Sequence, residues 1–317
     1  MIDIFKLLKA TESAAINVYK YIGLDDKNEI DRITVESIRK ILNEIDFCGI
    51  VCLAEGKKDN APTFYNNELV GLRKNNYMTS TGFISEEINN NFCYDLVIDS
   101  AEGTTQIANT GSEAMSVMAI SSHNSFYTTG YYYMNKLVVG PKIAKHIILN
   151  ILDPVERIIQ LVAKVLDKSI NNILACILNR PRHNELINKI RNLGCKIKLI
   201  NDCDISSGVA SCLDDSGIDL AIGIGGNTEG IITASAVKCL GGDFQCVFCD
   251  NNAKPINNTV YNTNDLIKDR VLFIATGILN GMLFRGVKYF RSNYVTHSLL
   301  LDSFTKSIQR IETFHYL

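Results

Sequence analysis

Apolar residues recur at helical spacing early in the chain. Between Thr34 and Ile45 they occupy positions 35, 38, 41, 42 and 45, which predicts an amphipathic helix with Thr34 as its N-cap. Residues 11–21 predict another helix, and Asp153-Pro154 predicts the start of a third, with proline at the first helical position. The polar residues 26–31 are interpreted as a loop between the first two helices, and residues 69–91 as a longer one.

Short apolar runs mark the strands. They cover residues 48–53, 95–99, 114–120, 173–178, 196–200, 219–222, 271–276 and 310–316. In the second half the runs alternate with helical patterns at residues 181–193 and 229–239. This alternation predicts an α/β fold with crossover connections and a parallel region. A chain of 317 residues is long enough for two α/β lobes or for one layered domain. We expect lobes at residues 1–150 and 151–317.

Composition narrows the class of partner. The formal net charge is −2 and the pI is about 6.2, so no global basic field would attract nucleic acid or a membrane surface. The ten cysteines are scattered, several of them within apolar runs, which predicts buried, reduced thiols in a cytosolic protein. Cys246-x-x-Cys249 has no second pair at zinc-finger spacing, so a zinc or redox role is the weaker interpretation. We expect neither a secretory signal nor a membrane span.

Acidic clusters follow several of the predicted strands. Asp99 and Glu102 come directly after an apolar run and are followed by Gly103 and Thr104. Similar clusters lie at residues 54–59, 201–204 and 223–230. Ligands of α/β sheets gather at the carboxyl ends of the strands, where several carboxylates would repel one another without a cation. Oxygen ligands beside a hydroxyl suit Mg²⁺ or Mn²⁺ acting on a phosphate, although each cluster alone also fits a solvated loop.

A series of motifs in one order resembles the class II fructose-1,6-bisphosphatases. The motifs are Thr11-Glu12-Ser13-Ala14-Ala15, Asp26-Lys27-Asn28-x-x-Asp31, Glu55-Gly56-x-x-Asp59-x-Ala61-Pro62, Asp99-x-x-Glu102-Gly103-Thr104, Tyr133-Met134-x-Lys136-Leu137-x-Val139-Gly140-Pro141, Pro181-Arg182-His183, Asp202-x-Asp204, Gly223-Ile224-Gly225-Gly226-x-x-Glu229-Gly230, Ala275-Thr276-Gly277-Ile278 and His315-Tyr316-Leu317. The resemblance implies a layered sugar-phosphatase fold, with alternating helix and mixed-sheet layers and an active site between two lobes. It also implies a cytosolic, homo-oligomeric enzyme that converts fructose 1,6-bisphosphate to fructose 6-phosphate and phosphate, as in gluconeogenesis.

The resemblance also implies roles for single residues. The implied ligands of two Mg²⁺ or Mn²⁺ ions are Asp31, Glu55, Asp99, Glu102 and Glu229. Thr104 would orient the attacking water, Asp59 would accept a proton or support the metal ligands, and Lys27 would meet a phosphoryl oxygen. The implied substrate-binding residues are Glu102, Gly103, Thr104, Tyr133, Arg180, Pro181, Arg182, Asp202, Cys203, Asp204 and Gly226. Arg180 and Arg182 would hold the distal phosphate, and Asp202 and Asp204 would accept from sugar hydroxyls.

The sequence also departs from the family pattern and leaves alternatives open. Ser100-Ala101 replaces the usual proline and large aliphatic residue between the two acids, Asn135 replaces a common acid, Arg180 replaces a lysine, and residues 241–269 are abbreviated. Asp59 also fits a helix N-cap, and Lys27 a surface lysine paired with Asp26. The alternative functions are a phosphatase for sedoheptulose 1,7-bisphosphate or an inositol phosphate, and a non-catalytic protein that binds sugar phosphates.

Overall fold

The computed structural model describes residues 3–54, 63–77 and 93–316, and its chain forms two compact units. Unit 1 contains residues 1–128 and 268–317, and unit 2 contains residues 129–267. The boundary expected from the sequence lies after residue 150 instead. The difference arises because the last strands return to the sheet of the first unit, where β11 pairs with β4.

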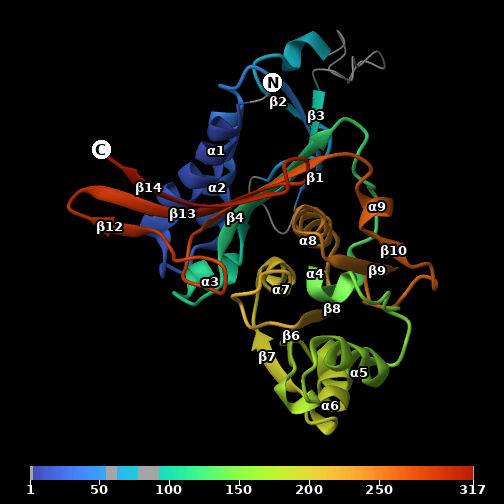
Figure 1. Ribbon diagram of the computed structural model, residues 1–317. Helices are drawn as coiled ribbons and strands as arrows, with labels where there is room; N and C mark the ends of the chain where they lie inside the picture. Colours follow the sequence, from blue (N-terminus) through green and yellow to red (C-terminus); the bar gives the residue numbers. More distant parts are fainter. Residues whose placement is uncertain (1–2, 55–62, 78–92, 317) are drawn as a thin grey trace. The chain divides into compact units, whose positions relative to one another are not determined.

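The sheet of unit 1 is mixed and has the order β12-β13-β11-β4-β3-β1-β2, with β14 paired to the free side of β13 (Figure 1). Its strands are β1 (Cys48–Ala54), β2 (Glu68–Val70), β3 (Cys93–Glu102), β4 (Met115–Ser122), β11 (Val271–Gly277), β12 (Lys288–Phe290), β13 (Asn293–Asp302) and β14 (Ser307–His315). Only β1 and β3 pair in parallel, while the remaining pairs described are antiparallel. This arrangement sets β3, which carries the main acidic motif, between two neighbours.

Two long helices cover one face of this sheet. The helices of unit 1 are α1 (Ile4–Val18), α2 (Lys27–Leu42) and the short α3 (Thr104–Ala108). Leu7 and Ala14 of α1 and Ile38 of α2 pack with Leu96 and Ile98 of β3 in one buried cluster. Burial of these apolar side chains is the main stabilising contribution to the unit.

The start of α2 corrects the sequence analysis. The helix begins at Lys27, with Asp26 as the N-cap that accepts a hydrogen bond from the Glu29 backbone, whereas Thr34 lies in its interior and donates to the Ile30 carbonyl. The polar residues 26–31 were interpreted as a loop because they carry few apolar side chains. Residues 27–31 are helical because Asp26 caps them and Arg32 bridges acids one turn away on either side.

Unit 2 is a three-layer α/β/α arrangement. Its sheet has the order β10-β9-β5-β8-β6-β7, and β7, β6 and β8 are parallel, as the alternating pattern predicted (Figure 1). The strands are β5 (Tyr133–Val139), β6 (Leu174–Leu178), β7 (Lys196–Ile200), β8 (Leu220–Gly226), β9 (Asp243–Cys249) and β10 (Tyr261–Asn262). The helices are α4 (Pro141–Ala144), α5 (Val155–Leu166), α6 (Asn184–Asn192), α7 (Asp204–Ala210), α8 (Asn227–Leu240) and α9 (Thr263–Leu266).

Smaller differences from the predicted elements are local. Pro154 is the N-cap of α5 and not its first residue, and the helix predicted for residues 181–193 begins as a 3₁₀ turn, Pro181–His183, before α6. The predicted loop 69–91 begins with two residues of β2 and the 3₁₀ turn Lys74–Tyr77, and residues 78–91 lie outside the described part. None of the ten cysteines is in a disulfide, and nine of them are buried. No helix among the described residues is long and apolar enough to cross a membrane.

Candidate active site

The carboxylates of Asp99 and Glu102 lie together at the carboxyl end of β3. The register between β3 and β4 shifts between these two residues, because one extra residue is inserted in β3. The bulge brings an oxygen of Asp99 within 4.8 Å of an oxygen of Glu102. Both side chains are buried, and the Ala101 backbone donates a hydrogen bond to Asp99 Oδ1 at 3.2 Å. The two acids that were predicted to converge therefore do so.

This pair fits a hard divalent cation. Two buried carboxylates at this separation repel each other strongly in a medium of low dielectric constant, and a cation between them removes that repulsion. The donor atoms are all oxygen, which suits Mg²⁺ or Mn²⁺ and not the softer metals that prefer sulfur.

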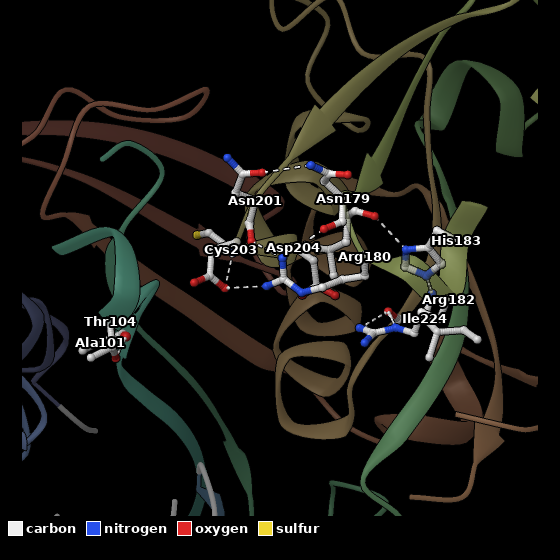
Figure 2. Close-up of polar contacts among 12 residues, drawn as sticks. Ala101, Thr104, Asn179, Arg180, Arg182, His183, Asn201, Cys203, Asp204 and Ile224 are labelled. Atoms are coloured by element: carbon white, nitrogen blue, oxygen red, sulfur yellow. Dashed lines mark hydrogen bonds and ion pairs between the residues drawn. The ribbon is translucent and has the colours of Figure 1, made fainter. Parts of the chain in front are cut away.

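A hydroxyl lies next along the chain, and a carboxylate of α2 contacts it. Gly103 has a φ of +89°, a left-handed conformation that turns the backbone sharply out of β3 and into α3. Thr104 is the first residue of α3, and its hydroxyl oxygen lies 2.9 Å from Asp31 Oδ1. The same oxygen lies 2.9 Å from the Ala101 carbonyl (Figure 2). The structure thus brings Asp31 of α2 to Thr104, which are 73 residues apart in sequence.

The other predicted residues of this unit are placed differently. Lys27 is exposed as the first residue of α2, directly after its N-cap Asp26. Glu55 and Asp59 lie outside the described residues, so their assigned roles stay predictions.

Unit 2 places the predicted arginines after β6, beside the ends of β7 and β8. Arg180 Nη1 donates to the Asn201 carbonyl at 2.5 Å, and Arg182 donates through Nε and Nη2 to the Ile224 carbonyl at 3.2 and 2.8 Å (Figure 2). Pro181 separates the two and is exposed. Each guanidinium is thus oriented by a backbone carbonyl and retains further N–H donors for an anion.

The Arg182 guanidinium also lies over a predicted substrate-binding aromatic ring. Its carbon is 5.3 Å from the centre of the Tyr133 ring, within the range of a cation–π contact. Tyr133 is the first residue of β5 and is partly exposed, so its ring limits the positions open to Arg182.

The Asp202-Cys203-Asp204 segment is held in an unusual conformation. Cys203 has φ 64° and ψ 57°, the left-handed region that is costly for a residue with a Cβ, and it precedes α7. Asp204 pairs through Oδ2 with Lys136 Nζ at 2.5 Å, and both side chains are at least nine-tenths buried. The other oxygen of Asp204, Oδ1, is buried with no hydrogen-bond partner among the described residues. A buried acceptor of this kind is a ready partner for a ligand hydroxyl.

The last two glycines of β8 make room for the carboxylates of Asp204 and Glu229. A Cβ built on Gly225 would lie 1.8 Å from Asp204 Oδ2, and one built on Gly226 would lie 1.9 Å from the carboxylate of Glu229. Glu229 is in the first turn of α8, where a carboxylate is stabilised by the free amides and the helix dipole. Gly226 is therefore needed for the Glu229 side chain to lie against the backbone.

Comparison with known proteins decides the family. The family model described as "Bacterial fructose-1,6-bisphosphatase, glpX-encoded" matches residues 3–315. The chain belongs to the class II fructose-1,6-bisphosphatase family. It is 32% identical to the "Fructose-1,6-bisphosphatase class 2" of Haemophilus influenzae, over 98% of this chain and 94% of that protein. It is 30% identical to proteins named "D-fructose 1,6-bisphosphatase class 2/sedoheptulose 1,7-bisphosphatase" from Synechocystis and Synechococcus, over 98% of this chain and 95% and 94% of theirs.

Two further residues of this class II fructose-1,6-bisphosphatase family member, Lys136 and His183, lie beside the predicted site residues. Lys136 was quoted in a motif without a role, although a lysine within the apolar run of β5 was a signal that it has a buried partner. His183 was quoted in the Pro181-Arg182-His183 motif without a role, and its ring contacts the backbone of β6 and β8 beyond their last paired residues. Its Nδ1 donates to the Leu178 carbonyl at 2.7 Å, and its Nε2 accepts from the Ile224 backbone at 2.8 Å (Figure 2). Arg182 and His183 thus hold both polar groups of the Ile224 residue.

Neutral His183 is expected to make stability depend on pH. Burial lowers the pKa of His183 from its ordinary value of 6.5, because desolvation disfavours the charged imidazolium. The unfolded chain then binds the proton first, so this stabilisation is full above pH 6.5 and declines as pH falls towards the folded-state pKa. As the pH falls through this range, we expect the free energy of unfolding of the wild type to decrease by up to about 1.4 kcal/mol per pH unit more than that of His183→Gln. Urea unfolding of both proteins between pH 7.5 and pH 5 measures this difference in the free energy of unfolding. The same pH dependence in both proteins would contradict the prediction.

Proposed function

We propose that this protein hydrolyses the 1-phosphate of fructose 1,6-bisphosphate, producing fructose 6-phosphate and phosphate with Mg²⁺ or Mn²⁺ as cofactor. The single observation that supports this best is the buried pair of carboxylates, Asp99 and Glu102, beside the Thr104 hydroxyl. The family membership of the chain supplies the reaction and the substrate class.

We propose two metal positions. As the family resemblance implies, Asp99, Glu102 and Glu229 would hold one ion, and Asp31 and Glu55 would hold the other. When bound, the ions neutralise charge on the phosphoryl oxygens and lower the pKa of the attacking water. The fit of the first position rests on the oxygen donors of Asp99 and Glu102 and on their burial.

Thr104 is proposed to orient the water that attacks the phosphorus. Its hydroxyl has one hydrogen, which it donates towards Asp31 Oδ1 or the Ala101 carbonyl. The lone pairs of the Thr104 oxygen then accept a hydrogen from the water, which aligns the water's own lone pair with the phosphorus. Asp59 is proposed as the group that takes up the released proton, and Lys27 as a donor to a phosphoryl oxygen.

The distal phosphate is proposed to bind to the arginine pair of unit 2. Arg180 and Arg182 are oriented by backbone carbonyls and bring guanidinium donors to the same strand ends, with Pro181 between them. Asp202 and Asp204 would accept from sugar hydroxyls, and the buried Oδ1 of Asp204 supports that role. The remaining contacts proposed for the substrate are Gly103, Tyr133, Cys203 and Gly226.

Sedoheptulose 1,7-bisphosphate is a second candidate substrate. Two relatives that align with almost the whole chain carry both activities in their names. A sugar with one more carbon keeps both phosphates, so the same arginines and carboxylates would serve it. We also propose that the enzyme works in the cytosol, which the ten cysteines without a disulfide support.

Phosphate release by the purified wild type tests the function. We expect release from fructose 1,6-bisphosphate with Mn²⁺ or Mg²⁺, and a loss of at least about a hundredfold with EDTA, because metal ions supply several kcal/mol of transition-state stabilisation. Sedoheptulose 1,7-bisphosphate, inositol 1-phosphate and fructose 6-phosphate in parallel separate the substrate classes. No release from any bisphosphate by a folded protein would contradict the proposal and favour a binding role.

A further inference from the structure

Strand β14 forms an outer edge of the unit 1 sheet over its whole length. Its nine residues pair with β13 in an uninterrupted register, from Asp302↔Ser307 to Tyr294↔His315. Among the described residues, no strand pairs with the other side of β14 (Figure 1). A row of backbone N–H and C=O groups therefore points outward along this edge.

This edge lacks the features that usually prevent strand-to-strand association. Proteins protect exposed edges with short strands, proline, lysine or bulges. The outer strand at the other end of this sheet, β2, has three residues, and so does β12. By contrast, β14 is nine residues long, contains neither lysine nor proline, and has no shift of register.

One face of β14 presents a self-complementary series of side chains. Ile308, Arg310, Glu312 and Phe314 alternate along the strand and are exposed, and the apolar Ile308 and Phe314 are 52% and 57% exposed. On the other face, Ile311 packs against the buried core of the unit. The exposed series is apolar, positive, negative and apolar in order along the strand. When two copies of it run in opposite directions, each charge faces the opposite charge and each apolar side chain faces an apolar one.

We propose that a second copy of this chain pairs with β14 in antiparallel fashion, about a two-fold axis through Ile311. Residues of the two strands that face each other then lie on the same face of the joined sheet. Arg310 of one copy faces Glu312 of the other, and Ile308 faces Phe314. Each pair occurs twice, because a two-fold interface uses the same patch on both copies.

The register follows from the charges. Pairing centred on Arg310 or on Glu312 would set that charge directly opposite its own copy, which is destabilising. Among the registers that keep each side chain on its own face, only the one centred on Ile311 sets Arg310 opposite Glu312. The same register sets an aliphatic side chain opposite an aromatic one, a favourable cross-strand pair. This inference concerns assembly and does not depend on the proposed catalytic function.

Charge reversal tests the interface. By sedimentation velocity at micromolar concentration, we expect the wild type to be a dimer or an assembly of such dimers, and Arg310→Glu to raise its dissociation constant roughly tenfold or more. The double variant Arg310→Glu/Glu312→Arg reverses both members of the pair and is expected to return to within about threefold of the wild type. Arg291→Glu makes the same change of net charge on an exposed residue just before β13 and is the matched control.

Three results would overturn the inference. These are a wild type that is monomeric at every concentration, an assembly that Arg310→Glu leaves intact, and a double variant that does not recover. Glu312 contacts His297 at 3.0 Å within its own chain, so Glu312→Arg is made only together with Arg310→Glu. Phe314→Lys replaces an exposed apolar side chain and is expected to cause the same dissociation. It tests the interface if Arg310→Glu does not fold.

Discussion

Replacing Asp99 by asparagine is expected to reduce metal-dependent phosphate release on the order of a thousandfold. Asp99 is fully buried at the end of β3, and its carboxylate lies beside that of Glu102. The amide keeps the shape of the side chain but removes one negative charge from the proposed ligand set. A metal ion contributes several kcal/mol to such a transition state, and about 1.4 kcal/mol corresponds to a factor of ten in rate.

A second measurement separates metal binding from catalysis. A ligand that binds only the folded state raises the thermal midpoint of unfolding. We expect added Mn²⁺ to raise the midpoint of the wild type and to leave that of Asp99→Asn almost unchanged. Without metal, Asp99→Asn is expected to be at least as stable as the wild type, because it removes repulsion between two buried carboxylates.

Asp95→Asn is the matched control on the same strand. Asp95 is also buried, but it accepts hydrogen bonds from His123 Nδ1 at 2.8 Å and from the Asn124 backbone at 2.7 Å. This change is expected to lower stability while metal-dependent turnover persists. If Asp99→Asn kept both its turnover and its response to Mn²⁺, the proposed metal position would be wrong.

Replacing Lys136 by methionine is expected to destabilise the protein by about 3–5 kcal/mol, because it leaves the buried Asp204 carboxylate without its cation. The Nζ–Oδ2 distance is 2.5 Å, and the side chains are 8% and 10% exposed. The free energy of unfolding from urea titrations measures the effect. Phosphate release from the remaining folded protein should fall as well, because Lys136 positions the carboxylate that is proposed to bind the sugar.

The double variant Lys136→Met/Asp204→Leu distinguishes an unpaired charge from a packing defect. Replacing a buried ion pair by apolar residues often changes stability little. The double variant should therefore recover most of the unfolding free energy that Lys136→Met loses, but not the activity. Lys189→Met is the control on an exposed pair with Glu185, and it is expected to leave the unfolding midpoint nearly unchanged. If Lys136→Met lowered the free energy of unfolding no more than Lys189→Met does, the expectation would be wrong.

The sequence by itself determined the local elements and the kind of chemistry. Runs of four to seven residues marked eight of the fourteen strands described, and most of these runs are apolar because a strand buried on both faces needs a continuous apolar segment. Two acids three residues apart at the end of such a run already indicated an oxygen-rich site, since both lie close along the chain whatever the rest of the fold does. Local patterning failed at the start of α2, where the stabilising cap and charge pairs of Asp26 and Arg32 carry no apolar signal.

Only the tertiary structure decided which distant residues meet. Val271 of β11 pairs opposite Ser121 of β4, which places the last strands in the first unit, and no local pattern specifies that partner. The Asp31–Thr104 and Lys136–Asp204 contacts likewise join residues 73 and 68 positions apart. Such contacts depend on how whole elements pack, because their free energy is gained only once the intervening chain has been ordered.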